Sequence, residues 1–396
     1  MTGERTDSSV FRKKRIFIPM IEVGGGHKAV GLAIRDAIER LHPGEYEMSV
    51  VDFPCICGAR MTDRSLKAFW SACLAQPVIT NKVNIWLEAM NGLLRSNAVT
   101  RFFSVDFVMK GMRYIRELQP DFIISTHFFC TSVAVFARET YGLDCRIVSH
   151  VNDPFHAHPF WVNQLADEVI VCSRSAFDHM AKMGQKQESM TILPLPLHAK
   201  FFDPVTRSRE EILTELGLEP SRLTILASSG GEGIGDTSHF IREVYLSGLP
   251  VNLITVSGRN ERLLKASRLL AARPSKALMA PIGYAANMNE LAFASDVGLA
   301  KAGPSSLLEM LTKGCPVMLT HVAHQAEQGN LDFILDGGMG WDIRNPETFA
   351  EVLDNLLKPG FLEPYQRRIR ENEYVRLLPG ASERLAIHLL AGMKPP

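Results

Sequence analysis

The chain has 396 residues, of which 46% are hydrophobic and 22% are charged, as in ordinary globular proteins. Its 43 basic and 43 acidic residues cancel, which argues against a nucleic-acid-binding protein. No apolar run reaches the roughly 18 residues of a membrane-spanning helix, and the N-terminus lacks the apolar core of a signal peptide. Seven scattered cysteines predict reduced thiols. We therefore expect a cytoplasmic protein of two domains.

Short apolar runs and amphipathic helices alternate along both halves of the chain. This alternation predicts an α/β protein with two doubly wound, mainly parallel, Rossmann-like sheets that face each other across a cleft. The expected strands are 16–21, 48–53, 120–125, 146–150, 168–172, 223–227, 251–256, 276–282, 296–300 and 316–320. The expected helices are 28–40, 175–183, 237–246, 288–294, 307–313, 347–357 and 381–393.

The proline-punctuated segment 191–197 is typical of a linker between the two halves. We expect a disordered N-terminus at 1–14, a first domain at 15–198 and a second domain at 199–375. The last segment, 376–396, is expected to form a helix that packs back toward the first domain. The polar residues 321–330 are expected to form a loop after the last strand of the second domain.

A glycine-rich turn, Gly24-Gly25-Gly26-His27, follows the first expected strand. Its spacing matches neither the dinucleotide fingerprint nor the P-loop. Glycines let a ligand approach the backbone closely, and a neutral imidazole is suited to proton transfer near pH 7. His27 is therefore a candidate acid-base residue. A histidine that merely begins a helix in water fits the same pattern.

Polar residues also follow two other strands of the first half. Thr-His at 126–127 comes after the strand 120–125, and Asn-Asp at 152–153 comes after the strand 146–150, ahead of His-Pro-Phe-Trp at 158–161. Ligands of open α/β sheets bind at the carboxyl ends of the strands. These residues are therefore expected to lie on the ligand-binding edge of the first sheet.

The stretch 301–309, Lys-Ala-Gly-Pro-Ser-Ser-Leu-Leu-Glu, joins an expected strand to an expected helix. Such a turn predicts an anion site, because free backbone N–H groups and the positive end of the helix dipole face one point. The alternative is a capping box, in which Ser306 and Glu309 only close the helix start. A second glycine-rich turn, at 228–235, adds another phosphate-type turn to the same half.

The segment 61–116 is helical, aromatic and basic, with eight basic and three acidic residues that give a net charge of +5. This composition is typical of a surface that lies on an anionic membrane, with Trp70 and Trp86 as membrane contacts. An ordinary helical layer over a sheet, with lysine stems along apolar surface, fits the composition equally well.

Taken in order, these motifs resemble the glycosyltransferases typified by monogalactosyldiacylglycerol synthase and processive diacylglycerol glucosyltransferase. A more distant likeness is to the N-acetylglucosaminyltransferase that makes lipid II. Each motif is weak alone, whereas the ordered set is fairly specific. The matching stretches are GGGH at 24–27, STH at 125–127, ND at 152–153, HPFW at 158–161, KAGPSSLLE at 301–309 and EQGN at 327–330.

The resemblance implies a GT-B fold, in which the first half binds the acceptor and the second half binds a UDP-sugar. It implies an inverting hexosyltransferase that moves galactose or glucose from UDP to a lipid hydroxyl, above all that of diacylglycerol. We expect peripheral association with an anionic membrane and no nucleic-acid partner. No metal or other cofactor is expected, because the chain lacks an Asp-x-Asp pair and backbone amides can hold a diphosphate.

By matching position, His27 and Asp153 would face the acceptor hydroxyl, with His27 the preferred general base. Glu309 would hold the donor ribose, and the turn at Gly283 and Tyr284 would lie against the uracil. The residues expected to hold the diphosphate are Gly230, Gly231, Ser305 and Ser306, and those expected to reach the hexose are Glu327 and Asn330. Further donor-binding candidates are Arg259, Lys301, Gly303, Gln325 and Gln328. The acceptor-binding candidates are Gly25, Gly26, His127, His158 and Trp161.

Two positions depart from the pattern of the family. Ser305 stands where the family usually has glycine, and Ala326 stands where it has glutamine. Gln325 would replace that glutamine after a shift of one residue. The identity of the sugar is therefore open. Two alternatives of the same fold are a UDP-sugar 2-epimerase and a non-catalytic nucleotide-sugar-binding protein.

Overall fold

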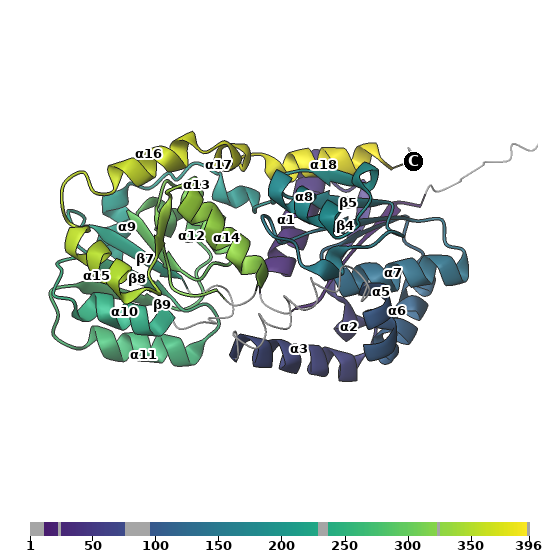
Figure 1. Cartoon of the computed structure of the whole chain (residues 1–396), viewed down its shortest axis with the longest axis horizontal. Helices are drawn as coiled ribbons and strands as arrows, with labels where there is room; N and C mark the ends of the chain where they lie inside the picture. Colours follow the sequence, from purple (N-terminus) through teal and green to yellow (C-terminus); the bar gives the residue numbers. More distant parts are fainter. Residues whose placement is uncertain (1–11, 23–24, 76–95, 229–236, 323–324, 394–396) are drawn as a thin grey trace, which may run out of the picture.

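The computed structural model describes residues 12–22, 25–75, 96–228, 237–322 and 325–393, and their side chains except those of 69–75, 96 and 102–103. The described strands form two six-stranded sheets in which every pairing is parallel. The two sheets lie side by side along the long axis of the molecule, with helices packed around each (Figure 1). The expected α/β class with two doubly wound sheets is confirmed.

The first sheet has the strand order β2-β1-β3-β4-β5-β6. Its strands are β1 Lys14–Met20, β2 Tyr46–Asp52, β3 Phe122–Ser125, β4 Arg146–His150, β5 Glu168–Val171 and β6 Met190–Ile192. Its helices are α1 Gly26–Leu41, α2 Phe53–Ile56, α3 Arg60–Ala75, α5 Ser96–Phe103, α6 Val105–Leu118, α7 Phe128–Tyr141 and α8 Arg174–Lys182. Short 3-10 turns lie at Pro159–Trp161, Gln187–Ser189 and Ala199–Phe201.

The second sheet has the strand order β12-β11-β10-β7-β8-β9. Its strands are β7 Thr224–Ser228, β8 Asn252–Val256, β9 Leu278–Ile282, β10 Val297–Ala300, β11 Val317–Leu319 and β12 Gly340–Asp342. The helices of this half are α9 Arg209–Glu215, α10 Thr237–Leu246, α11 Glu261–Ala271, α12 Met288–Phe293, α13 Pro304–Thr312, α14 Gln325–Asp336, α15 Pro346–Asn355, α16 Glu363–Glu371, α17 Glu373–Leu377 and α18 Ala381–Ala391.

The central strands are apolar because both of their faces are buried. In β1, Ile16 and Ile18 belong to one core cluster, whereas Phe17 belongs to the cluster on the opposite face. Pro19 is tolerated in this strand. Its carbonyl accepts from the Thr126 amide at 3.2 Å, and its nitrogen faces the same side, where the ladder with β3 has ended at Phe17.

The expected linker 191–197 overlaps the last two residues of β6 and otherwise lies outside helices and strands. Two other expectations about elements were wrong. Most of the expected polar loop 321–330 is helical, because α14 begins at Gln325. Helix α13 begins at Pro304, three residues earlier than expected. Apart from α14, the elements without a counterpart among the expected ones are helices α2, α7, α9, α11, α16 and α17 and strands β6 and β12.

The order of strands reverses once in each sheet. In the first sheet the reversal lies between β1 and β3, and in the second it lies between β7 and β10. Connections leave the sheet in opposite directions at such a point, so a crevice opens outside the carboxyl ends of the two strands. His27 of the GGGH turn lies at the first of these two points, and the 301–309 turn lies at the second.

The two halves are clamped together by aromatic contacts. Phe155 of the first half stacks on Phe333 of α14, with ring centroids 4.0 Å apart and planes at 12°, and it also meets Tyr374 of α17 at 4.9 Å. The Tyr374 hydroxyl in turn lies 3.1 Å from the Leu195 amide, from which it accepts. Helix α18 returns to pack on α1 of the first half, as Figure 1 also shows. The Ser382 hydroxyl of that helix donates to the Leu197 carbonyl at 2.7 Å.

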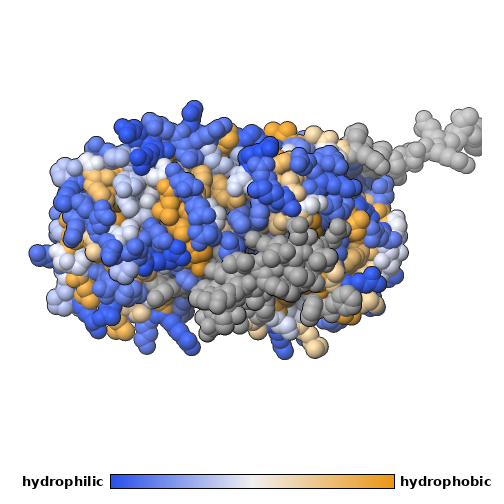
Figure 2. All heavy atoms as spheres, in the orientation of Figure 1, coloured by the Kyte–Doolittle hydropathy of each residue, from blue (hydrophilic) through white to orange (hydrophobic). Residues whose placement is uncertain are grey.

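The visible surface is mainly hydrophilic, with apolar side chains in scattered areas (Figure 2). Among the described residues, no helix is both long and apolar enough to span a bilayer.

Replacement of Phe155 tests the clamp between the halves. Phe155→Ala removes a buried ring from the contact with Phe333 and Tyr374. We expect the free energy of unfolding, measured by urea denaturation, to fall by about 3 kcal/mol. Phe155→Leu, which keeps most of the apolar volume, should cost about 1 kcal/mol. A wild-type urea midpoint in Phe155→Ala would show that the clamp adds no stability.

Candidate functional site

His27 lies at the reversal point of the first sheet, as the second residue of α1. Its Nδ1 atom is 2.5 Å from the Thr126 carbonyl oxygen, at the end of β3, and 2.8 Å from Asn152 Nδ2. The Thr126 hydroxyl donates to the His27 carbonyl at 3.2 Å. Three chain segments therefore hold one half-buried imidazole at the carboxyl edge of the sheet.

The contact with Thr126 assigns the tautomer of His27. Two acceptors at 2.5 Å would repel each other, so Nδ1 carries the proton and donates it to the carbonyl. In this tautomer Asn152 Nδ2 and His27 Nδ1 are two donors that share the Thr126 carbonyl, and their own 2.8 Å contact is not a hydrogen bond. The other nitrogen, Nε2, then carries the lone pair. His27 is thus prepared to accept a proton at Nε2.

His127 lies beneath His27, with the two ring centroids 4.8 Å apart. Its side chain is buried and caps α7 by accepting from the Phe129 amide at Nδ1. Burial, reinforced by the neighbouring His27 and His158, holds the pKa of His127 well below its ordinary value. The neutral His127 ring packs against His27 and offers no charge to a ligand.

The Asp153 carboxylate is engaged in holding the loop that carries the HPFW motif. Its Oδ2 accepts from Trp161 Nε1 at 2.7 Å and from the His158 amide at 3.2 Å. Trp161 is buried, so its ring offers no open face to an acceptor, which corrects that expectation. His158 is half-buried and stacks on Phe128.

The 301–309 turn lies at the reversal point of the second sheet, where β10 runs into α13. Gly303 is the N-cap and makes no side-chain cap, and Pro304 is the first helical residue. The first intrahelical amide bond is that of Leu307, so the amides of Ser305 and Ser306 point out of the helix start without intrahelical partners. Together with the hydroxyls of Ser305 and Ser306, they form an anion-binding arrangement.

The capping-box interpretation of Ser306 and Glu309 was wrong, because the helix begins before Ser306. In the described part of the chain the Glu309 carboxyl has no hydrogen-bond or ion-pair partner. Burial alone raises the pKa of Glu309 to about 7. A poorly solvated carboxyl that lacks a partner, one turn from an anion site, is placed to accept hydroxyl groups of a ligand.

Two residues of the EQGN motif hold the turn itself. Glu327 is 2% exposed, and its Oε1 accepts from Lys301 Nζ at 2.8 Å. Asn330 is buried and donates from Nδ2 to the Ala302 carbonyl at 2.8 Å, while its buried Oδ1 has no hydrogen-bond partner among the residues that the structure describes. The closed turn leaves little of either side chain open to a hexose. Of their neighbours on α14, Gln325 is half-buried, and Gln328 donates to Asp332 at 2.7 Å.

An ion pair joins the two halves beside these turns. Glu22, just after β1, accepts from Lys28 at 2.9 Å, and its Oε1 is 3.6 Å from the Arg259 guanidinium, which follows β8. The bond from Lys28 and the charge of Arg259 lower the pKa of Glu22 against the effect of burial. Sequence reasoning selected Arg259 but missed Glu22, whose position directly after the first strand was the available clue.

The remaining candidates fall into three groups. Tyr284 is exposed at the carboxyl end of β9, next to Gly283. Gly25 and Gly26 begin α1, with space around both α-carbons. Gly24, Gly230, Gly231, Trp86 and the side chain of Trp70 lie outside the described residues.

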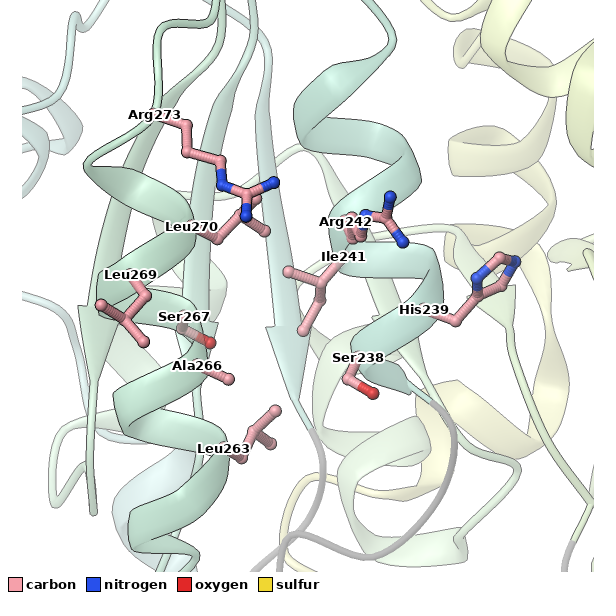
Figure 3. A pocket seen from close by; sticks show the side chains of 10 residues that line it. All are labelled: Ser238, His239, Ile241, Arg242, Leu263, Ala266, Ser267, Leu269, Leu270 and Arg273. Carbon is pink, nitrogen blue, oxygen red and sulfur yellow. The ribbon is translucent and has the colours of Figure 1, made fainter.

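A groove of about 670 Å³ lies between α10 and α11, away from both reversal points (Figure 3). Its cations are Arg242 and Arg273, and its walls are mainly apolar. None of the predicted site residues lines it. Among the described residues, no group of three or more histidine, cysteine or acidic side chains is arranged to hold a metal ion.

Comparison with known sequences identifies relatives that are described as monogalactosyldiacylglycerol synthases. A family model described as monogalactosyldiacylglycerol (MGDG) synthase matches residues 84–197. The probable monogalactosyldiacylglycerol synthase of Glycine max is 26% identical over 370 residues, which cover 90% of this chain and 67% of that protein. Monogalactosyldiacylglycerol synthase 1 of Arabidopsis thaliana is 25% identical over 368 residues, covering 89% and 66%. The chain thus spans about two thirds of the length of these relatives, and the expected resemblance is confirmed.

Solved structures confirm the GT-B fold. The Staphylococcus aureus MnaA–UDP complex has a TM-score of 0.61 at 13% identity, with 97% of this chain and 99% of that chain covered. MurG of Acinetobacter baumannii has a TM-score of 0.59 at 15% identity, with 96% and 99% covered. Anabaena HepE in complex with UDP and glucose has a TM-score of 0.55 at 14% identity, with 96% and 100% covered.

The raised pKa of Glu309 predicts a pH-dependent stability. Between about pH 4.5 and pH 7 the folded chain binds this proton more tightly than the unfolded chain, so its contribution to stability is lost as pH rises. Glu309→Gln removes the titration. Relative to this variant, we expect the wild type to lose about 1–2 kcal/mol of unfolding free energy between pH 5 and pH 8. Urea midpoints that differ by the same amount at both pH values would contradict the assignment.

Proposed function

Because the chain is a GT-B relative of the monogalactosyldiacylglycerol synthases, we propose that it transfers galactose or glucose from a UDP-sugar to the hydroxyl of diacylglycerol. One observation supports this above all: the two reversal points carry complementary chemistry. The first holds His27 with an Nε2 lone pair, and the second holds an anion-binding helix start beside the partnerless Glu309. A base and a leaving-group site are the two parts that an inverting sugar transfer needs.

In the proposed reaction, Nε2 of His27 removes the proton from the acceptor hydroxyl as the oxygen attacks the anomeric carbon. The bond from that carbon to the UDP oxygen breaks, and the diphosphate leaves with the electron pair. A single in-line displacement inverts the anomeric centre. The amides of Ser305 and Ser306 and the dipole of α13 stabilise the charge that develops on the diphosphate.

The donor would lie along the carboxyl edge of the second sheet. Glu309, when ionised, accepts both ribose hydroxyls, and the exposed ring of Tyr284 covers the uracil. Arg259 adds a positive charge near the diphosphate after leaving Glu22. Lys301 is held by Glu327 and therefore shapes the turn.

Asp153 has a supporting role in this proposal. Its bonds to Trp161 and the His158 amide fix the loop over which the acceptor enters. His27 therefore remains the proposed base, and Asp153 acts on it through the shape of the site.

An exposed apolar patch supports contact with a membrane. It consists of Ile56, Met61, Val105 and Met109, from α2, α3 and α6, which contact one another. Met61 is 77% exposed and Met109 is 61% exposed, whereas most large apolar side chains of this half are buried. The exposed cations on the same helices are Arg60, Arg64, Lys110 and Arg113, of which Lys110 pairs with Asp106 at 2.7 Å. Apolar side chains with a basic rim suit an anionic bilayer surface, where diacylglycerol is found.

Transfer to lipid is the direct test of the function. Radiolabelled UDP-galactose and UDP-glucose are each incubated with diacylglycerol vesicles, and the lipid fraction is analysed. We expect labelled glycolipid with at least one donor, and His27→Ala should reduce the rate by at least about 100-fold. A 2-epimerase would change the sugar without labelling lipid, and a non-catalytic binding protein would only retain the donor. Full activity in a correctly folded His27→Ala variant would exclude His27 as the base.

The patch has its own test. We expect the double variant Met61→Ser, Met109→Ser to float less with vesicles that contain anionic lipid, since about 1 kcal/mol of apolar transfer energy is lost per buried side chain. Leu269→Ser is the matched control, because Leu269 is also 64% exposed but lies on α11 of the other half. Equal loss of flotation in both variants would contradict a specific membrane surface.

A further inference from the structure

A buried polar chain leads from the end of β4 through Asn152 of the ND motif toward His27, and it begins at His150, which belongs to none of the motifs. His150 is the last residue of β4, and its ring is fully buried. Its Nδ1 atom lies 2.8 Å from Asn152 Oδ1. The other ring nitrogen, Nε2, is buried without a hydrogen-bond partner among the described residues.

The orientation of the Asn152 amide follows from the Thr126 carbonyl. The Asn152 atom that lies 2.8 Å from this oxygen has to be a nitrogen, because a carbonyl only accepts. The amide oxygen therefore faces His150, and His150 Nδ1 carries the proton that it donates. The bond donated by His150 therefore holds the amide in the orientation that the Thr126 carbonyl requires.

Asn152 and His27 share the same acceptor. Both Asn152 Nδ2 and His27 Nδ1 reach the Thr126 carbonyl oxygen, at 2.8 Å and 2.5 Å. If the amide turned over, its oxygen would face the carbonyl oxygen at this distance, and the two would repel. The turn before α7 would then shift, together with the acceptor of the His27 proton.

We infer that His150 and Asn152 are positioning residues that set the tautomer and orientation of His27 through the Thr126 carbonyl. The part of this inference that concerns catalysis rests on the proposed role of His27 as the base. The part that concerns the tautomer is a property of the folded chain, whatever reaction it performs.

The protonation state of His150 suits this role. Burial lowers the pKa of His150 to about 4, although the bond to Asn152 opposes the shift. His150 therefore stays neutral near pH 7 and presents one N–H and no charge. The other titratable groups close to His27 are His127, directly below it, and Asp153, which acts through Trp161.

The test compares four proteins: the wild type, His150→Phe, His150→Gln and Ser149→Ala. Phe keeps the ring but removes the donor to Asn152, whereas the Gln side-chain amide can restore it. Ser149→Ala is the matched control: Ser149 lies on the same strand as His150, and the variant removes its buried 3.1 Å bond to Thr131 of α7 without touching Asn152. Imidazole ¹⁵N spectra of histidine-labelled protein report the tautomer, with the His27 signals assigned by their loss in His27→Ala.

We expect wild-type His27 to be protonated at Nδ1, and His150→Phe to shift it toward a mixture of tautomers. The kcat of sugar transfer should fall about 10-fold in that variant with an unchanged KM for the UDP-sugar, because base orientation changes while donor contacts do not. His150→Gln should restore both readouts, and Ser149→Ala should change neither.

Either of two results would overturn the inference: a wild-type His27 protonated at Nε2, or a His150→Phe variant that matches Ser149→Ala in both tautomer and kcat. The wild-type spectrum decides the first point even if His150→Phe does not fold. A tautomer shift confined to His150→Phe in a chain that transfers no sugar would support the inference and refute the proposed function.

Discussion

The reversal of strand order in each sheet is the constraint on which the whole site depends. Between β1 and β3, and again between β7 and β10, neighbouring strands send their connections to opposite sides of the sheet. The space outside their carboxyl ends is therefore left to short turns. His27 occupies one such turn and Ser305 the other, and each is held by backbone groups of the adjoining strands or helix. The chemistry lies on rigid strand ends, which explains why so few side chains are needed to position it.

The loop that carries Phe155 helps to fix the position of the two crevices relative to each other. Phe155 inserts between α14 and α17, and the neighbouring His156 lies against Gly329, where a β-carbon would come within 2.6 Å of the His156 side chain. The same helix α14 supplies Glu327 and Asn330 to the 301–309 turn. The loop that Asp153 shapes in the first half therefore also fixes the turn of the second half. The proposed acceptor and donor sites are thus joined by direct packing between the two halves.

Polar side chains that are wholly or partly buried divide into two kinds here. Lys301 with Glu327 and His150 with Asn152 are paired, and such groups hold backbone in place. Glu309 is the contrasting case, since burial raises its pKa to about 7 and no described protein group compensates it. An uncompensated carboxyl costs stability, and proteins keep such groups where a ligand supplies the missing partner.

Sequence alone determined the alternation of strands and helices, because the spacing of apolar residues and the glycine-rich turns are local properties of the chain. It also selected His27 and the 301–309 turn, since both follow strands directly. It could not show that α14 begins at Gln325, because a polar run with Gly329 in its middle favours a loop. The helix is explained by the packing of Leu331 and Ile334 in the core. The glycine is explained by the close approach of His156. The sequence also could not decide between a cap and a ligand site at Glu309. That choice depends on where the helix starts relative to Pro304 and on which groups lie nearby. The sequence placed Asn152 on the ligand-binding edge but missed His150 and the role of both residues, because that role lies in hydrogen bonds to Thr126, a residue distant in the chain that only the folded sheet brings close.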